Sequence, residues 1–237
     1  MKAMILAAGL GTRLGVLTRD IPKCLVEVAG KPMIVHVVEH LRAAGVTTIV
    51  INLHYLADKV RDYFAQHNFG VAIEFIYEPE ILGTGGAIKN ARKLLQDEPD
   101  FIVYNTDVYS DLDLGKFVEA HRSRNALVTL AVMDRPTSRP LLFDPTGQLV
   151  GWESGENKDQ PTSAGPVERL NFSGIQIISS GFFNYLEVEQ GAFSSIRPFL
   201  AAAKAGQRVF AFRIDASYWI DMGTPEKLEE LRHKVGQ

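Results

Sequence analysis

The chain has 237 residues, with 28 acidic and 25 basic side chains, so its formal net charge is −3 at pH 7. With 46% hydrophobic and 22% charged residues it has a globular composition, and at this length it can bury a sizeable core without cross-links. The slight acidic excess argues against a broad nucleic-acid-binding surface, because such surfaces carry a strong basic excess. No segment contains the ~18 consecutive apolar residues that a membrane-spanning helix needs, so we expect no membrane partner.

The single cysteine, Cys24, cannot form a disulfide within the chain and favours a reducing compartment. Residues 1–14 contain a lysine and a short apolar run, which glycine and arginine interrupt early. We interpret this segment as a buried first strand rather than a signal peptide. The sequence therefore predicts a cytoplasmic protein.

The first half of the chain alternates between two hydrophobic periods. Continuous apolar runs, several rich in β-branched residues, predict buried strands over 4–7, 48–52, 71–77, 101–105 and 126–133. Apolar residues at helical spacing predict helices over 32–44, 55–67, 84–95 and 112–121. Strands that alternate with helices predict a parallel sheet covered on both faces.

The second half has a different pattern. Residues 140–143 and 148–152 flank Asp144-Pro145-Thr146-Gly147, whose composition is typical of a type I turn, so we predict a hairpin. The polar segment 153–167 predicts a flexible loop. Further strands are predicted over 172–178, 209–214 and 218–220, and helices over 193–205 and 225–234, the last with Thr224 as its N-cap. No linker divides the chain, so we expect a single domain over 1–237.

A glycine-rich loop, Gly9-Leu10-Gly11-Thr12-Arg13-Leu14, follows the first strand. Glycines there let backbone N–H groups approach a phosphate, and Arg13 and Lys23 add positive charge. A dinucleotide fingerprint fails, because Leu14 replaces the third glycine and the second strand ends at Asn52 without an acid. A Walker loop fails because no Gly-Lys-Ser/Thr follows. Taken alone, the loop would also fit a plain strand-to-helix turn.

The wider pattern from Gly9 to Lys23 resembles the signature of the sugar-1-phosphate nucleotidylyltransferases, roughly G-x-G-T-R-L-x-x-L-T-x-x-x-P-K. The resemblance implies that the loop wraps the triphosphate of an NTP, with Arg13 on its phosphates and Lys23 near the reacting phosphates. The family usually has proline where this chain has Cys24, which we interpret as a packing variation rather than a nucleophile. The implied nucleotide-binding residues of this region are Leu6, Ala7, Ala8, Gly9, Gly11, Thr12 and Arg13.

A second glycine loop lies in the segment 80–87, which resembles the family pattern E-x-x-G-T-A/G-G. The resemblance implies that Gly83, Thr84 and Gly85 contact the nucleotide, because glycines at a helix start permit close backbone approach. In the uridylyl and thymidylyl branches a glutamine upstream often contacts the base. This chain has Glu78-Pro79-Glu80 there, which leaves the identity of the base open.

Two aspartates are candidates for a metal site. Asp107 follows the apolar run 101–105, and an aspartate at the carboxyl end of a parallel strand points into the crevice where ligands bind. Mg²⁺ prefers one or two carboxylates plus phosphate oxygens, although a simple strand-end turn is the alternative for Asp107. The segment 219–226 resembles the family's W-x-D-x-G-T-P-E, which implies that Asp221 joins Asp107 in holding Mg²⁺. Helix capping is the alternative for Asp221, but Thr224 is better placed for it.

A sugar pocket is implied by the segment 171–175, which resembles the family's N-x-G-type strand. The resemblance assigns Asn171, Gly174 and the strand-end Asn105 to this pocket, and Glu168 to the sugar hydroxyls. Arg169 stands where many members place a lysine for the sugar phosphate. A turn and a solvated loop end are the alternatives for Asn171 and Glu168.

The resemblance runs from Met1 to about Leu231 and implies an α/β fold, a Rossmann-like three-layer sandwich with a mixed, mostly parallel sheet. It divides the domain into a nucleotide-binding half, 1–135, and a sugar-binding half, 136–237. The implied reaction converts a sugar 1-phosphate and an NTP into an NDP-sugar and pyrophosphate. Arg13, Lys23 and Asp107 would act by positioning and charge neutralisation, because the attacking phosphate oxygen is already ionised and needs no general base.

The substrates are predicted less sharply than the reaction. The segments 171–175 and 191–194 look most like N-acetylmuramate 1-phosphate uridylyltransferases, whereas Arg13 and the segment 83–87 look equally like mannose- or heptose-1-phosphate guanylyltransferases. We predict uridylyl transfer, with guanylyl transfer as the alternative. Two rivals are a choline-phosphate cytidylyltransferase, which tends to lack the G-T-G-G loop, and a non-catalytic nucleotide-sugar-binding regulatory protein, which would be expected to lose Lys23 or an aspartate. We expect a monomer or small homo-oligomer that binds no nucleic acid.

Overall fold

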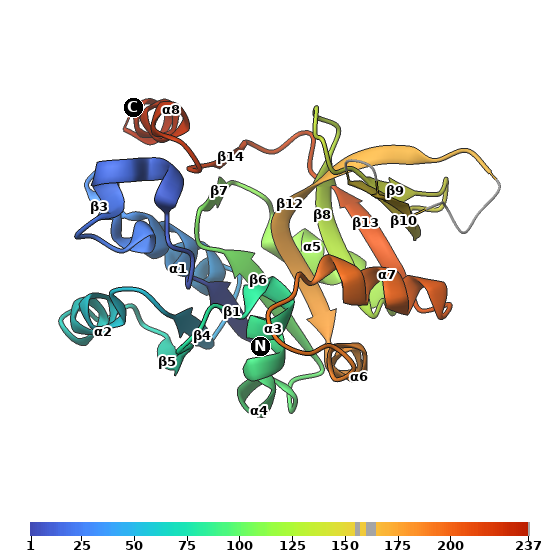
Figure 1. The fold of residues 1–237 in the computed structure, drawn as a ribbon, viewed down its shortest axis with the longest axis horizontal. Helices are drawn as coiled ribbons and strands as arrows, with labels where there is room; N and C mark the ends of the chain where they lie inside the picture. Colours follow the sequence, from blue (N-terminus) through green and yellow to red (C-terminus); the bar gives the residue numbers. More distant parts are fainter. Residues whose placement is uncertain (155–156, 160–164, 237) are drawn as a thin grey trace.

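The computed structural model describes residues 1–154, 157–159 and 165–236 of the chain. The fold is built around a central sheet. Its strands run in the order β11-β10-β9-β12-β6-β1-β4-β5, and β8 and β13 join through β12. Figure 1 shows β5 at one end and the β9–β10 hairpin at the other. The described residues as a whole, inside and outside this sheet, form the strands β1 (Lys2–Leu6), β2 (Glu27–Val28), β3 (Lys31–Pro32), β4 (Thr48–Leu53), β5 (Ala72–Tyr77), β6 (Asp100–Asn105), β7 (Val108–Ser110), β8 (Val128–Met133), β9 (Leu141–Phe143), β10 (Leu149–Ser154), β11 (Asn157–Asp159), β12 (Glu168–Ser179), β13 (Val209–Arg213) and β14 (Trp219–Asp221).

Helices cover both faces of this sheet. The α-helices are α1 (Met33–Ala43), α2 (Ala57–Ala65), α3 (Gly83–Asn90), α4 (Arg92–Leu95), α5 (Leu114–Ser123), α6 (Phe183–Leu186), α7 (Ile196–Lys204) and α8 (Pro225–Val235). Three short 3-10 helices within the described residues are η1 (Thr12–Thr18), η2 (Lys23–Leu25) and η3 (Ser180–Phe182). None of the helices in the described ranges is both long and apolar enough to cross a bilayer.

The direction of the strands decides where functional side chains can meet. β5, β4, β1 and β6 are parallel neighbours, whereas β12 runs antiparallel to both β6 and β8. β6 and β8 therefore point the same way, and their carboxyl ends, Asn105 and Met133, lie at one edge of the sheet. In an α/β sheet ligands bind at this edge.

Alternating side chains along the central strands build two cores. Ile5, Ile51 and Ile102 belong to one buried cluster with residues of α1, α2, α5 and α8. Their neighbours Met4 and Val50 belong to the other cluster, with residues of α3, α6 and α7. This alternation follows from the period of two along a strand. The structure thus has the predicted three layers and the mixed, mostly parallel sheet.

Most predicted elements of the first half are confirmed, with one difference. The single helix predicted over 84–95 consists of α3 and α4, which are separated at Ala91. Cys24 lies fully buried in a core cluster, and this burial raises the pKa of its thiol to about 12. A thiol of that pKa is no nucleophile at neutral pH, which agrees with the packing role predicted for it.

In the second half the predicted hairpin is confirmed, because β9 and β10 pair antiparallel and Asp144 accepts hydrogen bonds from the backbone of the turn. The loop predicted over 153–167 is wrong in part. β10 continues to Ser154 and pairs antiparallel with β11 at the border of the sheet. Residues 155–156 and 160–164 of that prediction lie outside the described residues. The predicted cap of α8 is confirmed, since the Thr224 side chain accepts from the Lys227 N–H.

Two histidines, the buried His121 and the partly buried His40, connect helices to neighbouring segments of the fold. His121 of α5 contacts Thr129 Oγ1 through Nδ1 at 2.8 Å, and its Nε2 lies 3.1 Å from Ser179 Oγ. His40 of α1 contacts the carbonyl of Leu112 at 2.8 Å. Burial lowers the pKa of both histidines below the ordinary value of 6.5. The folded state therefore favours the neutral imidazoles.

This burial predicts an acid-sensitive stability. The unfolded chain takes up protons on these histidines at a higher pH, so their stabilising contribution is complete above about pH 6.5 and is lost as the pH falls below it. We expect the melting temperature to decrease between about pH 7.5 and 5.5. The decrease should be smaller in His40→Gln and His121→Gln, and unchanged in the control His233→Gln, whose side chain is exposed. Parallel pH profiles for all four proteins would contradict this assignment.

Candidate active site

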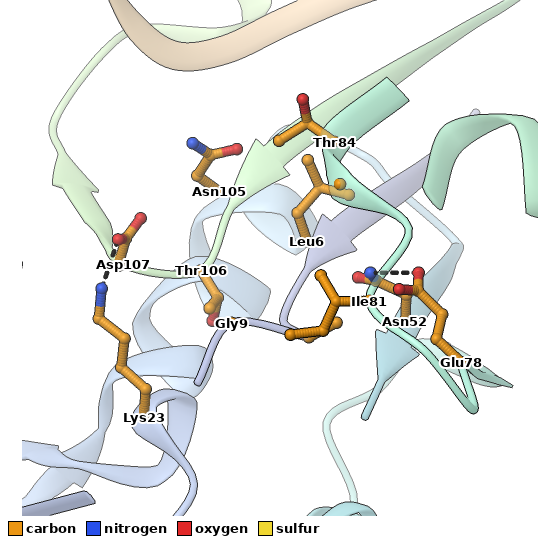
Figure 2. A pocket seen from close by; sticks show the side chains of 12 residues that line it. Leu6, Gly9, Lys23, Asn52, Glu78, Ile81, Thr84, Asn105, Thr106 and Asp107 are labelled. Atoms are coloured by element: carbon orange, nitrogen blue, oxygen red, sulfur yellow. Dashed lines mark hydrogen bonds and ion pairs between the residues drawn. The ribbon is translucent and has the colours of Figure 1, made fainter. Parts of the chain in front are cut away.

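A cavity of about 220 Å³ opens at the carboxyl ends of β1, β4 and β6. In Figure 2, Lys23 and Asp107 lie on one side of it and Asn52 and Glu78 on the other, with Ile81 between them. A second hollow of about 360 Å³ continues from it over the first glycine loop. The cavity is lined by Leu6, Ala8, Gly9, Lys23, Asn52, Glu78, Ile81, Gly83, Thr84, Asn105, Thr106 and Asp107, and the hollow adds Leu10, Gly11, Thr12, Arg13 and Gly223.

The first glycine loop depends on Gly11. Its φ is +68°, and a Cβ there would lie 2.9 Å from Thr18 Cγ2 and 3.1 Å from Lys23 Cβ. The carbonyl of Gly11 also accepts from the Thr18 hydroxyl at 2.9 Å. A side chain at this position would be strained and would push the loop away from Lys23. The glycine therefore folds the loop back onto the lysine.

The structure brings the predicted catalytic residues together. Lys23 Nζ lies 2.5 Å from Asp107 Oδ2, although the two residues are 84 positions apart, and only 11% of the lysine side chain is exposed. Arg13 approaches from the other side of the hollow, where a Cβ on Gly223 would lie 3.0 Å from its Nη2. Both cations thus border the hollow above the glycine loop.

Asp107 and Asp221 lie on adjacent backbone segments. β14 pairs antiparallel with β7, which places Asp221 opposite Val108, and Met222 N–H donates to the Asp107 carbonyl at 2.8 Å. The Asp221 carboxylate accepts from Lys227 Nζ and from the Gly223 N–H. Burial alone would raise the pKa of Asp221, but these hydrogen bonds and the charge of Lys227 hold it below the ordinary value. Asp221 is therefore ionised at neutral pH.

These aspartates offer the donor set that Mg²⁺ prefers, which is one or two carboxylates completed by phosphate oxygens. Within the described ranges no three His, Cys, Asp or Glu side chains cluster into a cage. His36 and His40, a pair four positions apart, are both bonded to backbone carbonyls, those of Val28 and Leu112. The residues present fit a hard cation held jointly by Asp107, Asp221 and a phosphate-bearing substrate.

The second glycine loop packs against a distant segment as well as lining the cavity. Gly83 has φ +71°, and a Cβ on it would lie 2.6 Å from the Phe193 carbonyl oxygen. A Cβ on Gly85 would lie 2.4 Å from the Phe193 ring, and its N–H donates to the Phe193 carbonyl at 3.0 Å. Gly83 and Thr84 line the cavity, whereas Gly85 faces Phe193. Gly85, which the sequence predicted to approach the nucleotide, thus makes room for the Phe193 ring.

The sequence prediction of the site missed four residues of the cavity, of which three are polar, namely Asn52, Thr106 and Glu78, and the fourth is Ile81. Asn52 is 3% exposed and ends an apolar run, which is the same signal that singled out Asp107. Its Oδ1 accepts from Ala7 N–H at 2.8 Å. Thr106 is 5% exposed, and its hydroxyl has no hydrogen-bond partner in the part of the chain that the structure describes. Thr106 lines the cavity, so this unpaired hydroxyl is a buried polar group directly beside the space that a ligand would fill.

Glu78 is the third cavity residue outside the predicted set. It is 1% exposed, its Oε1 accepts from Asn52 Nδ2 at 2.8 Å, and its Oε2 accepts from the Leu82 N–H at 3.1 Å. The dashed line in Figure 2 marks the contact with Asn52. One hydrogen bond to each oxygen fixes the orientation of the carboxylate at the cavity wall.

The predicted sugar-binding residues divide into two groups. Asn105 lines the cavity, and Gly174, with φ +85°, lies against it, since a Cβ there would be 2.7 Å from Asn105 Nδ2. Glu168 instead forms an ion pair with Arg213 at 2.8 Å, and the Asn171 amide donates to the Phe172 carbonyl. Neither Glu168 nor Asn171 is among the residues that line the cavity or the hollow.

Comparison with known proteins finds that a family model described as "Nucleotidyl transferase" matches residues 2–143. The chain belongs to the nucleotidyl transferase family. This confirms the family predicted from the motifs. The mannose-1-phosphate guanyltransferase of Aspergillus oryzae is 36% identical over 237 residues, which cover 95% of this chain and 62% of that protein. The enzyme of the same name from Yarrowia lipolytica is 33% identical, over 95% of this chain and 61% of its own length. The chain thus spans about three-fifths of these relatives.

Solved structures extend the similarity over the whole chain. HddC from Yersinia pseudotuberculosis superimposes with a TM-score of 0.80 at 31% identity, covering 99% of both chains. The same protein in complex with GMP-PN gives a TM-score of 0.79 at 32% identity. A UDP-glucose pyrophosphorylase complexed with UDP-glucose reaches 0.82 at 18% identity, which shows the shared fold alone.

Proposed function

We propose that this chain is a sugar-1-phosphate nucleotidylyltransferase that transfers a guanylyl group from GTP to a sugar 1-phosphate and releases pyrophosphate. The observation that carries the choice of base is the fixed carboxylate of Glu78 at the cavity wall. The names of the relatives from Aspergillus oryzae and Yarrowia lipolytica, and GMP-PN in the HddC complex, support the guanylyl alternative over the uridylyl transfer favoured by the sequence.

Guanine is the base whose hydrogen-bonding edge suits Glu78. Each carboxylate oxygen of Glu78 accepts one hydrogen bond from the protein and retains a lone pair for another. Guanine presents two adjacent donors, N1–H and the 2-amino group, which match two carboxylate oxygens as a charge-assisted pair. Uracil presents one N–H between two carbonyl oxygens, and adenine and cytosine place a ring acceptor beside their amino group. A carboxylate repels those acceptors, so the site discriminates by repulsion as well as by attraction.

The triphosphate is proposed to lie over the first glycine loop. The backbone N–H groups of residues 9–12, the guanidinium of Arg13 and the ammonium of Lys23 border the hollow there. Two polyanionic substrates repel one another, so these groups lower the electrostatic cost of bringing them together. Mg²⁺, held by Asp107 and Asp221, would supply further neutralisation of phosphate charge when bound. The sugar phosphate attacks the α-phosphorus in line with pyrophosphate as the leaving group.

We place the base and triphosphate on the half 1–135 and the sugar on the half 136–237, with Asn105 and Gly174 at their contact. The test is pyrophosphate release with GTP, UTP, CTP, ATP and dTTP against a panel of sugar 1-phosphates, with and without Mg²⁺. The expected result is highest turnover with GTP, and only in the presence of the metal. Highest turnover with UTP and N-acetylmuramate 1-phosphate would restore the uridylyl prediction. Nucleotide binding without turnover on any sugar would favour a regulatory protein.

Replacing Glu78 by glutamine tests the base assignment directly. The amide keeps the size of the side chain but loses its charge and one acceptor, so kcat/KM for GTP should fall by about 10- to 100-fold, the value of a bidentate pair. Turnover with UTP should fall less or rise, because an amide can pair with uracil. The matched control is Glu80→Gln, which changes an exposed glutamate two positions away. An unchanged ratio of GTP to UTP in Glu78→Gln would contradict the role of this carboxylate.

A further inference from the structure

Arg135 follows β8 and emerges at the ligand-binding edge of the sheet. β8 and β6 run in the same direction on either side of β12, so Arg135 and Asp107 follow strands that end at one edge. Arg135 Nη2 lies 3.8 Å from Asp221 Oδ2, and its side chain is 35% exposed. This arginine belongs to none of the motifs that predicted the site, yet it stands next to one of the two aspartates.

The guanidinium of Arg135 is held in place by an aromatic ring. Its Cζ lies 4.0 Å from the centre of the Trp219 ring, a cation–π contact. The ring itself is fixed, because Trp219 Nε1 donates to the Ser173 carbonyl at 2.8 Å. Ser173 precedes Gly174, which packs against Asn105 of the cavity. Trp219 thus connects the strand of Asp221 to Gly174 and orients Arg135 beside Asp221, next to the residues that line the cavity and the hollow.

Stacking leaves the N–H groups of a guanidinium available at its rim. Arg135 forms no hydrogen bond with any residue that the structure describes, and its contact with Asp221 is longer than a hydrogen bond. The neighbouring cations have carboxylate partners: Lys23 pairs with Asp107, and Lys227 with Asp221. Arg135 is therefore a cation of fixed orientation whose N–H groups remain available as hydrogen-bond donors, as expected of an arginine that binds phosphate.

Arg169, the cation that the sequence suggested for the sugar phosphate, is engaged elsewhere. Its Nη2 lies 3.0 Å from Glu153 Oε1, and its Nε lies 3.3 Å from Oε2 of the same carboxylate. It lies on β12 beside Glu168, in the stretch that pairs with β9 rather than with β6. The pair with Glu153 occupies the Nε–Nη2 edge of the guanidinium, an edge with which an arginine can bind a phosphate through two hydrogen bonds.

We infer that Arg135, stacked on Trp219, binds the phosphate group of the sugar 1-phosphate. This inference rests on the proposed function and names a residue for its second substrate. The nucleophilic phosphate must approach the α-phosphorus closely, which requires it to lie near Asp107 and Asp221. Arg135 is next to Asp221 and stacks on Trp219, whereas Arg13 lies beside Gly223 and borders the hollow over the glycine loop. Arg13 at the glycine loop would thus hold the nucleotide phosphates, and Arg135 beside Asp221 the phosphate of the sugar.

The test compares Arg135→Gln with two matched variants, Arg169→Gln and Arg139→Gln, which remove the same charge from nearby surface positions. With GTP and mannose 1-phosphate, Arg135→Gln should raise KM for the sugar phosphate by about tenfold or more, the effect of losing a charged hydrogen bond, and leave KM for GTP within about twofold. Arg135→Lys should restore part of this loss, since it keeps the charge without the planar fork. Arg139→Gln should match the wild type, and Arg169→Gln, which tests the alternative cation, should change KM for the sugar phosphate less than Arg135→Gln does. A merely structural role for Arg135 would lower stability or alter both Michaelis constants alike.

A binding measurement separates failure of this inference from failure of the proposed function. In a Trp152→Phe background Trp219 is the remaining tryptophan, so its fluorescence reports on the ring beneath Arg135. Mannose 1-phosphate should change this emission, whereas mannose without phosphate should not, and Arg135→Gln should abolish the response. This result would support the phosphate site even if no NTP were turned over. No response in the wild-type background, or an equal response and equal KM in Arg135→Gln, would overturn the inference.

Discussion

Replacing Asp107 by alanine is expected to lower kcat for pyrophosphate release by about a thousandfold or more. The carboxylate lies 2.5 Å from Lys23 and is joined to the strand of Asp221 through the Met222 N–H. Its loss would remove a ligand for Mg²⁺ and the partner that orients the lysine. The measurement is the initial rate at saturating GTP and sugar 1-phosphate. The change should appear in kcat more than in either Michaelis constant, because charge neutralisation matters most in the transition state.

The isosteric variant Asp107→Asn separates charge from shape, and it should lose most of the same activity. A suitable control is Asp134→Asn, which removes an exposed carboxylate after β8 at the same edge of the sheet. Melting curves of all three variants show whether the loss reflects folding. Turnover of Asp107→Ala within tenfold of the wild type would eliminate the proposed metal role of this residue.

Replacing Lys23 by alanine is expected to reduce kcat by about a hundredfold while changing the melting temperature little. Only 11% of the Lys23 side chain is exposed. The loop around Gly11 packs against this lysine and fixes its position. The charge therefore acts from a fixed position on the phosphates that react. Activity should be expressed per folded molecule, measured in parallel with a thermal melt.

The control for this variant is Lys31→Ala, which removes a lysine that pairs with Glu39 on the surface. An exposed pair of this kind contributes at most about 1 kcal/mol to stability, and Lys31 borders neither the cavity nor the hollow. A strongly lowered melting temperature for Lys23→Ala, with normal activity per folded molecule, would show that Lys23 is a structural residue instead.

The layers and the nucleotide side of the site were predictable because their signals are local. The strands around Ile5, Ile51 and Ile102 are continuous apolar runs, and their carboxyl ends had to meet once the sheet was parallel. The first glycine loop was identified from its spacing as far as Lys23. Predicting these features requires only residues that are neighbours in the sequence and the rule that ligands bind at the carboxyl edge of the sheet.

The sugar side was harder to predict because it is built by pairing between distant segments. β7 and β14 have three residues each and pair across more than a hundred positions, which no short pattern reveals. The strand predicted over 172–178 begins earlier, at Glu168, so the backbone of Glu168 and Arg169 pairs with β9. Their side chains pair with Arg213 of β13 and Glu153 of β10. Arg135 was missed because its orientation depends on its contact with Trp219, which lies on another strand.

The contact between the second glycine loop and Phe193 has a consequence for how the sequence can vary. A methyl group on Gly85 would overlap the Phe193 ring, and one on Gly83 would overlap its carbonyl. A smaller side chain at 193 would remove the closest overlaps at position 85 and leave the Ser195 nitrogen at 3.0 Å, whereas every obstacle at position 83 is backbone. Substitutions at 85 and 193 should therefore be epistatic, each harmful alone and milder together, whereas position 83 has no compensating partner.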